Sequence, residues 1–256
     1  MKNNELKELN GIDTLIEDLM EEWHVPGLAV GIVKDGEVVL SKGYGYRDVG
    51  SNLKMTDTTV LPIGSTTKSF TVMALGMLED EGKLDWDKPV KEYIPWFKMY
   101  DPFATERITI RDLLCHRSGL PHHDVHGVFT TRTRKQMVED LRYLQPSADF
   151  RTILQYQNHM VMTAGYVLEM ITGKTWEQFV QERIFNKLNM KSSNFSVDEL
   201  SKYPEYSKGY IYNGADAVQA DFLPLIGMAP AGAINSSVAD MTNYLLLQIN
   251  NGNFNG

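Results

Sequence analysis

The segment Ser65-Thr66-Thr67-Lys68 holds the residue pair with the clearest capacity for chemistry. A serine at the start of a helix and a lysine three residues later lie on one face, one turn apart, so the amine can approach the hydroxyl. Burial disfavours the ammonium form, and the neutral amine can then take the serine proton. The helix start favours negative charge, and the Ser65 backbone N–H is placed to donate to an oxyanion. The pattern predicts a serine nucleophile with a lysine base.

The spacing alone is not specific, because Ser51-Asn52-Leu53-Lys54 matches it as well. The two matches differ in context. Ser51 lies in a polar loop, whereas Ser65 opens the apolar run from Phe70 to Leu78 that a nucleophile on a buried helix requires. A plain helix N-cap is the alternative interpretation of Ser65, and at this point it stays open.

Tyr156-Gln157-Asn158 is the second candidate segment, since Tyr156 is the only one of twelve tyrosines with an asparagine two residues later. Residues two apart point the same way in an extended segment, so the phenol and the amide could enter one cavity. A phenol beside a lysine can relay protons, and an asparagine amide can hold a substrate carbonyl. Without Ser65, a tyrosine that only packs its ring would be the better interpretation.

Other reactive residue types give weaker signals. His122, His123 and His126 with Asp124 could bind a metal, but they follow a Gly-Leu-Pro loop, and we expect a solvated or substrate-lining loop instead. Cys115 continues an apolar helix face, which predicts a buried, inert thiol. The sequence has no Gly-x-Ser-x-Gly elbow and no glycine-rich nucleotide loop, which argues against an α/β-hydrolase and against nucleotide chemistry.

Apolar periodicity predicts the elements that must position these residues. We expect an amphipathic helix of about five turns over residues 6–23, stopped by Pro26-Gly27. A hairpin should follow, with strands 28–33 and 37–40 around Asp35-Gly36, and then a glycine-rich third strand over residues 43–46.

From Ser65 onward the pattern is helical. We expect a helix buried on all sides that ends at Gly82, and later helices over residues 109–119, 158–173, 175–188 and 237–249, several with capping signals. The predicted fold class is α+β, an antiparallel sheet with flanking helices plus a mostly helical lobe. We expect one catalytic domain over residues 1–256, with a helix and sheet part (1–64) and a mainly helical part (65–256).

The predicted sheet is small for this number of helices. Strands are visible only before residue 60, the last 60 residues show no clear further hairpin, and the chain stops in a polar turn sequence. These observations predict a C-terminally truncated chain that lacks further strands.

Composition restricts the partners. Lysine plus arginine number 25 and aspartate plus glutamate 33, giving a net charge of −8 that argues against nucleic-acid binding. The single cysteine excludes an internal disulfide, and no apolar run reaches the roughly 20 residues of a membrane span. The N-terminus lacks the apolar core of a signal peptide, so we expect a cytoplasmic protein.

Five stretches together resemble the penicillin-recognising serine hydrolases, which include serine β-lactamases and penicillin-binding proteins, and especially their class C-type branch of esterases and D-amino-acid peptidases. In chain order they are Val25 to Gly31 with its Asp-Gly turn, Ser65 to Phe70, Ile108 to Pro121, Tyr156 to Asn158, and Pro230 to Asp240. The likeness covers nearly the whole chain.

The resemblance implies roles for four residues. Ser65 would be the acyl-accepting nucleophile, Lys68 the base, Tyr156 a partner in proton transfer, and Asn158 the residue that positions the substrate amide or ester. The family needs no metal and no organic cofactor. Its third motif, Lys-Thr-Gly or His-x-Gly, is absent here, in line with a truncated chain.

The sequence therefore favours a serine hydrolase that acts by acyl-enzyme formation on a β-lactam, a D-amino-acid peptide or a small carboxylic ester. A non-catalytic or slowly acylating penicillin-binding or sensor-type module is the alternative. A helical scaffold in which Ser65 and Lys68 only cap a helix is a third hypothesis, which the four separate matches disfavour.

Overall fold

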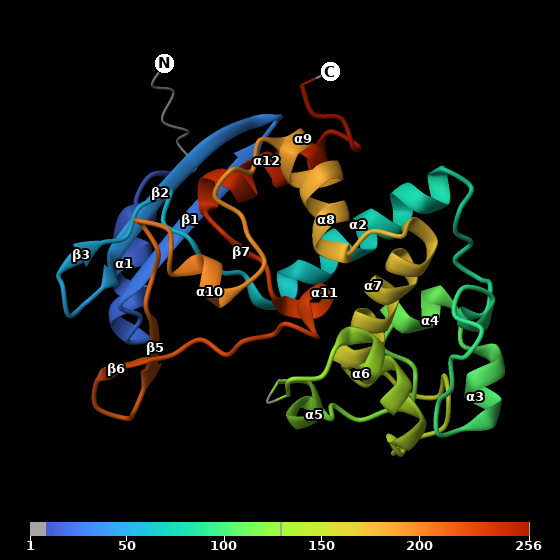
Figure 1. Ribbon diagram of the computed structural model, residues 1–256. Helices are drawn as coiled ribbons and strands as arrows, with labels where there is room; N and C mark the ends of the chain where they lie inside the picture. The colour runs from blue at the N-terminus through green and yellow to red at the C-terminus, as the bar shows by residue number, and fades with distance from the viewer. Residues whose placement is uncertain (1–8, 129, 256) are drawn as a thin grey trace. The chain divides into compact units, whose positions relative to one another are not determined.

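The chain divides into two compact units in a computed structural model that describes residues 9–128 and 130–255 (Figure 1). The first unit comprises the described residues of Met1–Pro62, Leu188–Phe222 and Asn235–Gly256. The second comprises those of Ile63–Lys187 and Leu223–Ile234. All four predicted site residues belong to the second unit, so its internal packing decides their geometry.

The first unit is built on the predicted hairpin, which is confirmed. Strand β1 (Gly27–Lys34) pairs antiparallel with β2 (Glu37–Asp48), and β3 (Leu53–Lys54) pairs with the other edge of β2. Asp35 and Gly36 form the turn with φ angles of 51° and 79°. The expected third strand over residues 43–46 is wrong as a separate element, because β2 runs without a break through those residues.

A helix near the C-terminus covers the paired strands β1 and β2. Helix α12 (Val238–Ile249) begins as predicted, with the Ser237 side chain accepting a hydrogen bond from the Asp240 backbone N–H. It approaches β1 at Gly31, where a Cβ atom would lie 2.8 Å from the side chains of Val238 and Thr242. Glycine is therefore required at this position for the helix to lie against the strand.

Three expectations for this unit are wrong. Helix α1 covers Ile12–Glu22, about three turns instead of five, because Gly11 adopts a positive φ of 83° before it; residues 1–8 lie outside the described part. A hairpin is present in the last 60 residues, formed by β5 (Gly209–Tyr212) and β6 (Ala217–Ala220). A short pair, β4 (Leu61–Pro62) with β7 (Asn235–Ser236), and helix α10 (Val197–Leu200) were not predicted either.

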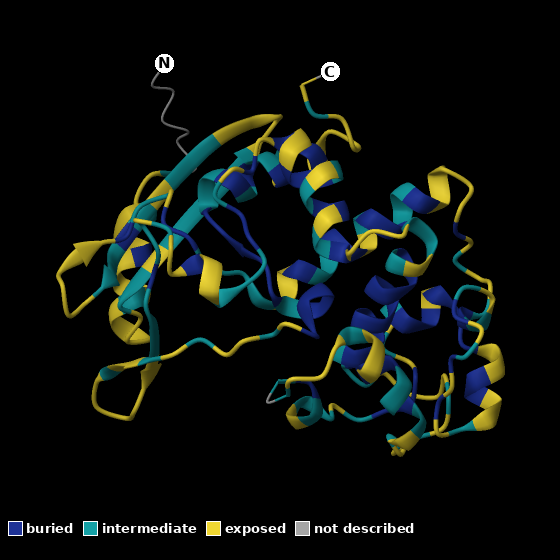
Figure 2. Ribbon diagram, in the orientation of Figure 1, coloured by how far each residue is buried: buried dark blue, intermediate teal, exposed yellow. Residues whose placement is uncertain are grey.

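The second unit is helical and is organised around α7 (Asn158–Thr172). Every residue of α7 from His159 to Leu168 is buried, as the continuous dark blue of this helix shows (Figure 2). Helices α2 (Thr67–Asp80), α4 (Ile110–Leu114), α6 (Arg134–Asp140), α8 (Trp176–Val180) and α11 (Ala229–Gly232) pack against it. The remaining helical segments are η2 (Gly64–Thr66), η3 (Val90–Glu92), α3 (Pro102–Arg107), α5 (Asp124–Val128), η4 (Leu141–Tyr143), the π-helical η5 (Gln181–Phe185) and α9 (Asn186–Leu188).

The predicted helix boundaries in this unit are mostly confirmed. Thr109 and Thr175 head capping boxes, and Gly82 and Gly173 end α2 and α7 with φ angles of 70° and 68°. Three predictions fail. Helix α4 ends at Leu114, before Ser118, and its C-cap Cys115 is exposed instead of buried. Helix α2 is not buried on all sides, since Val72 is 41% exposed.

Helix α11 lies unusually close to α7. A Cβ atom at Gly165 would lie 2.4 Å from the ring of Pro230, too close for any side chain there. A glycine in the middle of a helix lowers the stability of the helix by about 1 kcal/mol relative to alanine. The close approach of α11 therefore requires a residue that weakens α7. The approach fixes the backbone of residues 229–232 beside the N-terminal half of α7.

Candidate active site

Ser65 lies in a single 3-10 turn, η2, that leads directly into α2. Gly64 before it has a φ of 52°, a backbone conformation that favours glycine. The N-cap position of α2 belongs to Thr66, and no side-chain cap bond is present there. The hydroxyl of Ser65 is exposed and makes other contacts, so a plain N-cap does not describe it.

The amine of Lys68 is held at three points. Its Nζ lies 3.0 Å from Ser65 Oγ, 2.8 Å from Asn158 Oδ1 and 2.6 Å from the carbonyl oxygen of Ala231. The amide and carbonyl oxygens can only accept hydrogen bonds. Two of the amine's hydrogens are therefore directed away from Ser65, and the third position on nitrogen faces the serine hydroxyl.

The phenol of Tyr156 completes the contact around Ser65. Its hydroxyl donates to Ser65 Oγ at 2.5 Å, and Lys68 Nζ lies 4.8 Å from the centre of its ring. Tyr156 precedes α7, and Gln157 between it and Asn158 is extended (φ −143°, ψ 114°). The extended backbone puts Tyr156 and Asn158 on the same side, as their spacing predicts.

The structure thus brings all four predicted residues together. Asn158, the first residue of α7, accepts from Lys68 through Oδ1, and its Nδ2 donates to Asp124 Oδ1 at 3.1 Å. Residues 65, 68, 156 and 158 come from two helices and the segment before one of them, and all belong to the second unit. Their catalytic roles remain predictions at this stage.

His116 is a neighbour that the sequence did not single out. Its ring lies 4.6 Å from that of Tyr156, and its Nδ1 accepts from the Gln157 backbone N–H at 3.2 Å. Burial, together with the charge of Lys68, lowers the pKa of His116. The lowered pKa favours the neutral form of the ring beside the Tyr156 phenol. Its place in the Cys-His-Arg-Ser-Gly run, inside the stretch from Ile108 to Pro121 that carries the family resemblance, was the available sequence signal.

A cavity of about 100 Å³ opens beside the Ser65 hydroxyl. That volume corresponds to roughly three waters of liquid density, which suits a short acyl group. Its lining is mainly apolar with a few polar groups: Gly64, Ser65, Asp124, Val128, Asn158, Leu225, Met228, Ala231 and Gly232.

The histidine-rich loop and α5 form a hydrogen-bonded cluster. His122 Nδ1 lies 3.0 Å from Asp124 Oδ2, and His126 lies 3.0 Å from both His159 Nε2 and Asp140 Oδ2. Burial, with the positive charge of His126 as the next cause, lowers the pKa of His159 to about 4. Among the described residues, no three histidine, cysteine, aspartate or glutamate side chains are grouped as metal ligands.

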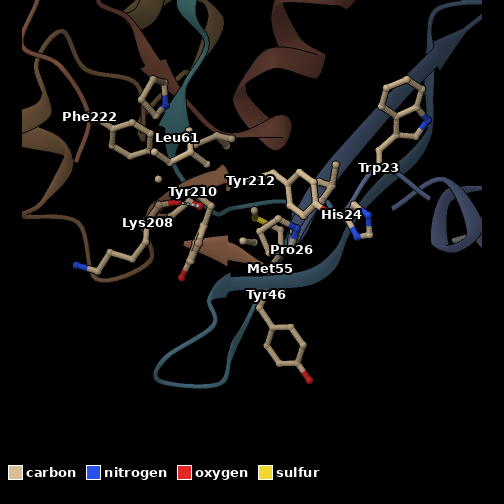
Figure 3. A pocket seen from close by; sticks show the side chains of 17 residues that line it. Trp23, His24, Pro26, Tyr46, Met55, Leu61, Lys208, Tyr210, Tyr212 and Phe222 are labelled. Atoms are coloured by element: carbon tan, nitrogen blue, oxygen red, sulfur yellow. Dashed lines mark hydrogen bonds between the residues drawn. The ribbon is translucent and has the colours of Figure 1, made fainter. Parts of the chain in front are cut away.

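A larger hollow of about 350 Å³ lies in the first unit (Figure 3). Aromatic side chains surround it, with His24 and Tyr212 stacked at 4.4 Å, and none of the four predicted site residues lines it. Size alone therefore does not identify the reactive site, and the smaller cavity beside Ser65 is the candidate.

Comparison with known proteins decides the family. The family model described as Beta-lactamase matches residues 12–256. The chain belongs to the beta-lactamase family. The resemblance and the α+β fold predicted from the sequence are thereby confirmed, and the beta-lactamase fold is that of a family whose members are generally hydrolases.

Curated relatives of this beta-lactamase family chain are moderately similar. The protein named "Unguisins hydrolase ungD'" from Aspergillus campestris (strain IBT 28561) is 32% identical over 244 residues, which are 90% of this chain and 45% of that protein. "Protein flp" from Staphylococcus aureus (strain MW2) is 30% identical over 247 residues, 93% of this chain and 48% of the relative. The chain spans about half the length of these relatives.

Solved structures show the same beta-lactamase fold. The octameric penicillin-binding protein homologue from Pyrococcus abyssi superposes with a TM-score of 0.84 at 30% identity, covering 96% of this chain and 57% of that one. FmtA from Staphylococcus aureus gives a TM-score of 0.77 at 26% identity, covering 93% and 65%.

Within the described residues, we find no helix of the length and apolar character that a membrane crossing requires. The cytoplasmic location expected from the sequence stays a prediction.

Proposed function

We propose that this chain carries the reactive centre of a serine hydrolase that cleaves an ester or amide through an acyl-enzyme. The observation that carries the proposal is the convergence of two groups on one hydroxyl. Tyr156 Oη lies 2.5 Å and Lys68 Nζ 3.0 Å from Ser65 Oγ. A nucleophile within hydrogen-bond reach of its base is the arrangement that covalent catalysis requires.

The hydrogen-bond partners of Lys68 support its role as base. Asn158 Oδ1 and the Ala231 carbonyl take two of its hydrogens. A neutral amine has two hydrogens and one lone pair, so in that form the lone pair must face Ser65 Oγ. The serine O–H would then donate to Lys68 while Tyr156 donates to the same serine oxygen. This arrangement supports attack by Ser65.

The proposed reaction has two halves. Ser65 Oγ attacks the substrate carbonyl carbon as its proton moves to Lys68 Nζ, and the carbonyl oxygen becomes an oxyanion toward which the Ser65 N–H can donate. The oxyanion collapses, the bond to the leaving group breaks, and the leaving group takes a proton relayed by Tyr156. Water then attacks the acyl-enzyme with the same groups as base and acid, which releases the acid and restores Ser65.

The cavity supports a small acyl group as substrate. Its volume of about 100 Å³ and its apolar wall of Val128, Leu225 and Met228 suit a short aliphatic chain. This cavity favours short carboxylic esters, and we propose β-lactams and D-amino-acid peptides, which the family resemblance implies, as the other substrate classes to test. The relative from Aspergillus campestris carries the word hydrolase in its name, which agrees with this class of reaction.

Active-site labelling tests the proposal. A fluorophosphonate probe should label the protein at Ser65, and Ser65→Ala should lose the label, with Ser51→Ala as the matched control that keeps it. Labelling at neither residue, or at Ser51, would refute the assignment of Ser65. Release of p-nitrophenol from p-nitrophenyl butyrate then separates the alternatives. Continuous turnover supports a hydrolase, whereas one stoichiometric burst supports a slowly acylating module.

A further inference from the structure

Asp124 makes a contact to the site that neither the sequence analysis nor the family comparison assigns. We propose that Asp124 is a positioning residue that fixes the orientation of the Asn158 amide. The proposal deepens the proposed function and rests on it, because it concerns how the same site presents Asn158 to a substrate. Asp124 lies at the start of α5 and lines the cavity beside Ser65.

The donors and acceptors around Asn158 allow only one orientation of its side-chain amide. On one side Lys68 Nζ lies 2.8 Å from Oδ1, and on the other Asp124 Oδ1 lies 3.1 Å from Nδ2. An ionised carboxylate can only accept hydrogen bonds, so it must face the amide nitrogen. A flipped Asn158 would place its oxygen against the carboxylate and its N–H groups against the amine. The carboxylate is therefore the group that directs the amide oxygen toward Lys68.

Asp124 is kept in the ionised form that this role needs. Burial favours the protonated form, but hydrogen bonds from His122 and Asn158 outweigh it and lower the pKa of Asp124. His122 Nδ1 lies 3.0 Å from Asp124 Oδ2, so the two carboxylate oxygens have separate partners. The His122 ring also lies 5.6 Å from that of Tyr156. Asp124 thus links the Asn158 amide to His122, which lies in the loop beside the Tyr156 phenol.

Helix α5 is held by the hydrogen bonds of its His126 side chain, and this keeps Asp124, the first residue of that helix, in place. The Gln157 side chain donates through Nε2 to the Pro121 carbonyl, so its Oε1 accepts from the backbone N–H and Nδ1 of His159. His159 Nε2 then has no proton and accepts from His126 Nδ1. His126 also faces Asp140 Oδ2 through Nε2 at 3.0 Å.

This series of contacts ends at the carboxylate of Asp140, the last residue of α6. Asp140 is contacted by His126 and also by Arg132, each at 3.0 Å. The His126–Asp140 contact ties α5 to α6, and the His126–His159 contact ties α5 to α7, the helix that begins with Asn158. Asp124 and Asn158 are therefore carried by helices that are bound to each other, which preorganises their hydrogen bond.

For the proposed reaction, the fixed amide has two consequences. Lys68 keeps the Asn158 oxygen as one of the two acceptors that direct its hydrogens away from Ser65, and Asn158 Nδ2 has a second N–H that can donate to a substrate carbonyl or amide oxygen. Without Asp124 the amide can rotate, and both effects weaken. A misplaced catalytic group can lower the rate by about 100-fold.

A double-mutant cycle tests the proposal. Asp124→Leu removes both acceptor oxygens and keeps the branched shape of the side chain, and we expect kcat for p-nitrophenyl butyrate to fall about 10- to 100-fold with KM changed less than about 3-fold. Asp124→Asn retains one acceptor for Asn158 and should recover part of the loss. In an Asn158→Ala background, Asp124→Leu should have no further effect on kcat. An undiminished effect in that background would show a structural role and refute the proposal.

A readout that does not depend on activity separates this proposal from the proposed function. In a ¹⁵N-labelled protein, the side-chain amide signals of Asn158 are assigned by their loss in Asn158→Ala. One amide proton should be shifted downfield by the carboxylate, and Asp124→Leu should abolish that shift. Signals of Asn158 that do not change in Asp124→Leu would overturn the positioning role. An inactive wild-type protein with the expected shift would overturn the proposed function alone.

Discussion

The chain contains two serine–lysine pairs at the same spacing, and only one of them forms a contact. Lys68 Nζ lies 3.0 Å from Ser65 Oγ at the start of α2. Ser51 instead donates to Asp48 Oδ2 at 3.1 Å in the turn between β2 and β3. Lys54 lies with its Nζ 3.7 Å from the centre of the Tyr46 ring.

The difference between the two pairs lies in the backbone of the two residues that separate each serine from its lysine. A helical turn puts positions i and i+3 on one face, whereas the β-turn sends them to different sides. Asn52 has a φ of 56°, and Lys54 belongs to strand β3, so the second pair cannot close. Spacing is therefore informative only together with the conformation that the surrounding sequence imposes.

The largest expected effect separates the two serines. Ser65→Ala should lower ester turnover by roughly 10⁶-fold, because it removes the nucleophile itself. Ser51→Ala should leave kcat/KM within about 2-fold, since it removes only turn hydrogen bonds on the surface. Initial rates with p-nitrophenyl butyrate measure both. Equal losses in the two variants would contradict the distinction between the pairs.

The two lysines give the next largest contrast. Lys68→Ala should lower the acylation rate by about 10²- to 10⁴-fold, the range for a positioned general base. Lys54→Ala removes a surface cation–π contact and should leave acylation unchanged. Stopped-flow labelling with the fluorophosphonate gives the acylation rate, and circular dichroism confirms that each variant is folded. A wild-type rate in Lys68→Ala would remove Lys68 from the mechanism.

Two tyrosines provide a smaller and more selective contrast. Tyr156→Phe keeps the ring beside His116 but removes the hydroxyl that lies 2.5 Å from Ser65, and we expect kcat to fall about 100-fold. Tyr46→Phe makes the same chemical change beside Lys54, and kcat should not change. A loss in both variants would indicate a general effect on folding and not a proton relay.

We expect acid to destabilise the packing around His159 and the turn at Ser51 at different pH values. The pKa of His159 is lowered to about 4 by burial and by the charge of His126, while the unfolded chain takes up the proton near 6.5. The neutral form stabilises the fold fully above pH 6.5, and this stability is lost as the pH falls from 6.5 toward 4. The free energy of unfolding should drop by about 2 kcal/mol between pH 7.5 and 5.

Urea unfolding at the two pH values measures this change, and His159→Gln should reduce the pH dependence. The turn at Ser51 should not respond in this range, because the Ser51 backbone N–H lowers the pKa of Asp48 below its ordinary value. Hydrogen exchange can follow the two regions separately. A similar response of both to pH 5 would argue against His159 as the cause.

Much of the second unit could be predicted from local sequence. Residues 65 and 68 share a helical face, and residues 156 and 158 share a side of an extended segment, so two short patterns located four site residues. That they come together across the fold depended on the family resemblance, since periodicity does not specify which helices pack. Asp124 and His116 act through tertiary contacts, and no local pattern marks such contacts.

Errors in the first unit have identifiable causes. The apolar spacing over residues 6–23 ignored Gly11, whose positive φ precedes the helix. The β5–β6 hairpin was missed although Asn213-Gly214 stands between two strand-forming runs, a turn signal of the kind used correctly at Asp35-Gly36. One error falls in the second unit, where α4 ends at Leu114, so Cys115 lies beyond the helix and is exposed instead of buried.

The third partner of Lys68 is a backbone atom, the carbonyl oxygen of Ala231, and this affects how the site can be studied genetically. All twenty amino acids carry the main-chain oxygen that Ala231 presents. Substituting Ala231 by every other residue would therefore test the packing of its side chain but would not remove the hydrogen-bond acceptor. A substitution that can displace this acceptor lies instead on the neighbouring helix α7. At Gly165 a single methyl group would push against Pro230 and shift the segment that bears the oxygen, so a variant distant in sequence would register as a defect of the lysine.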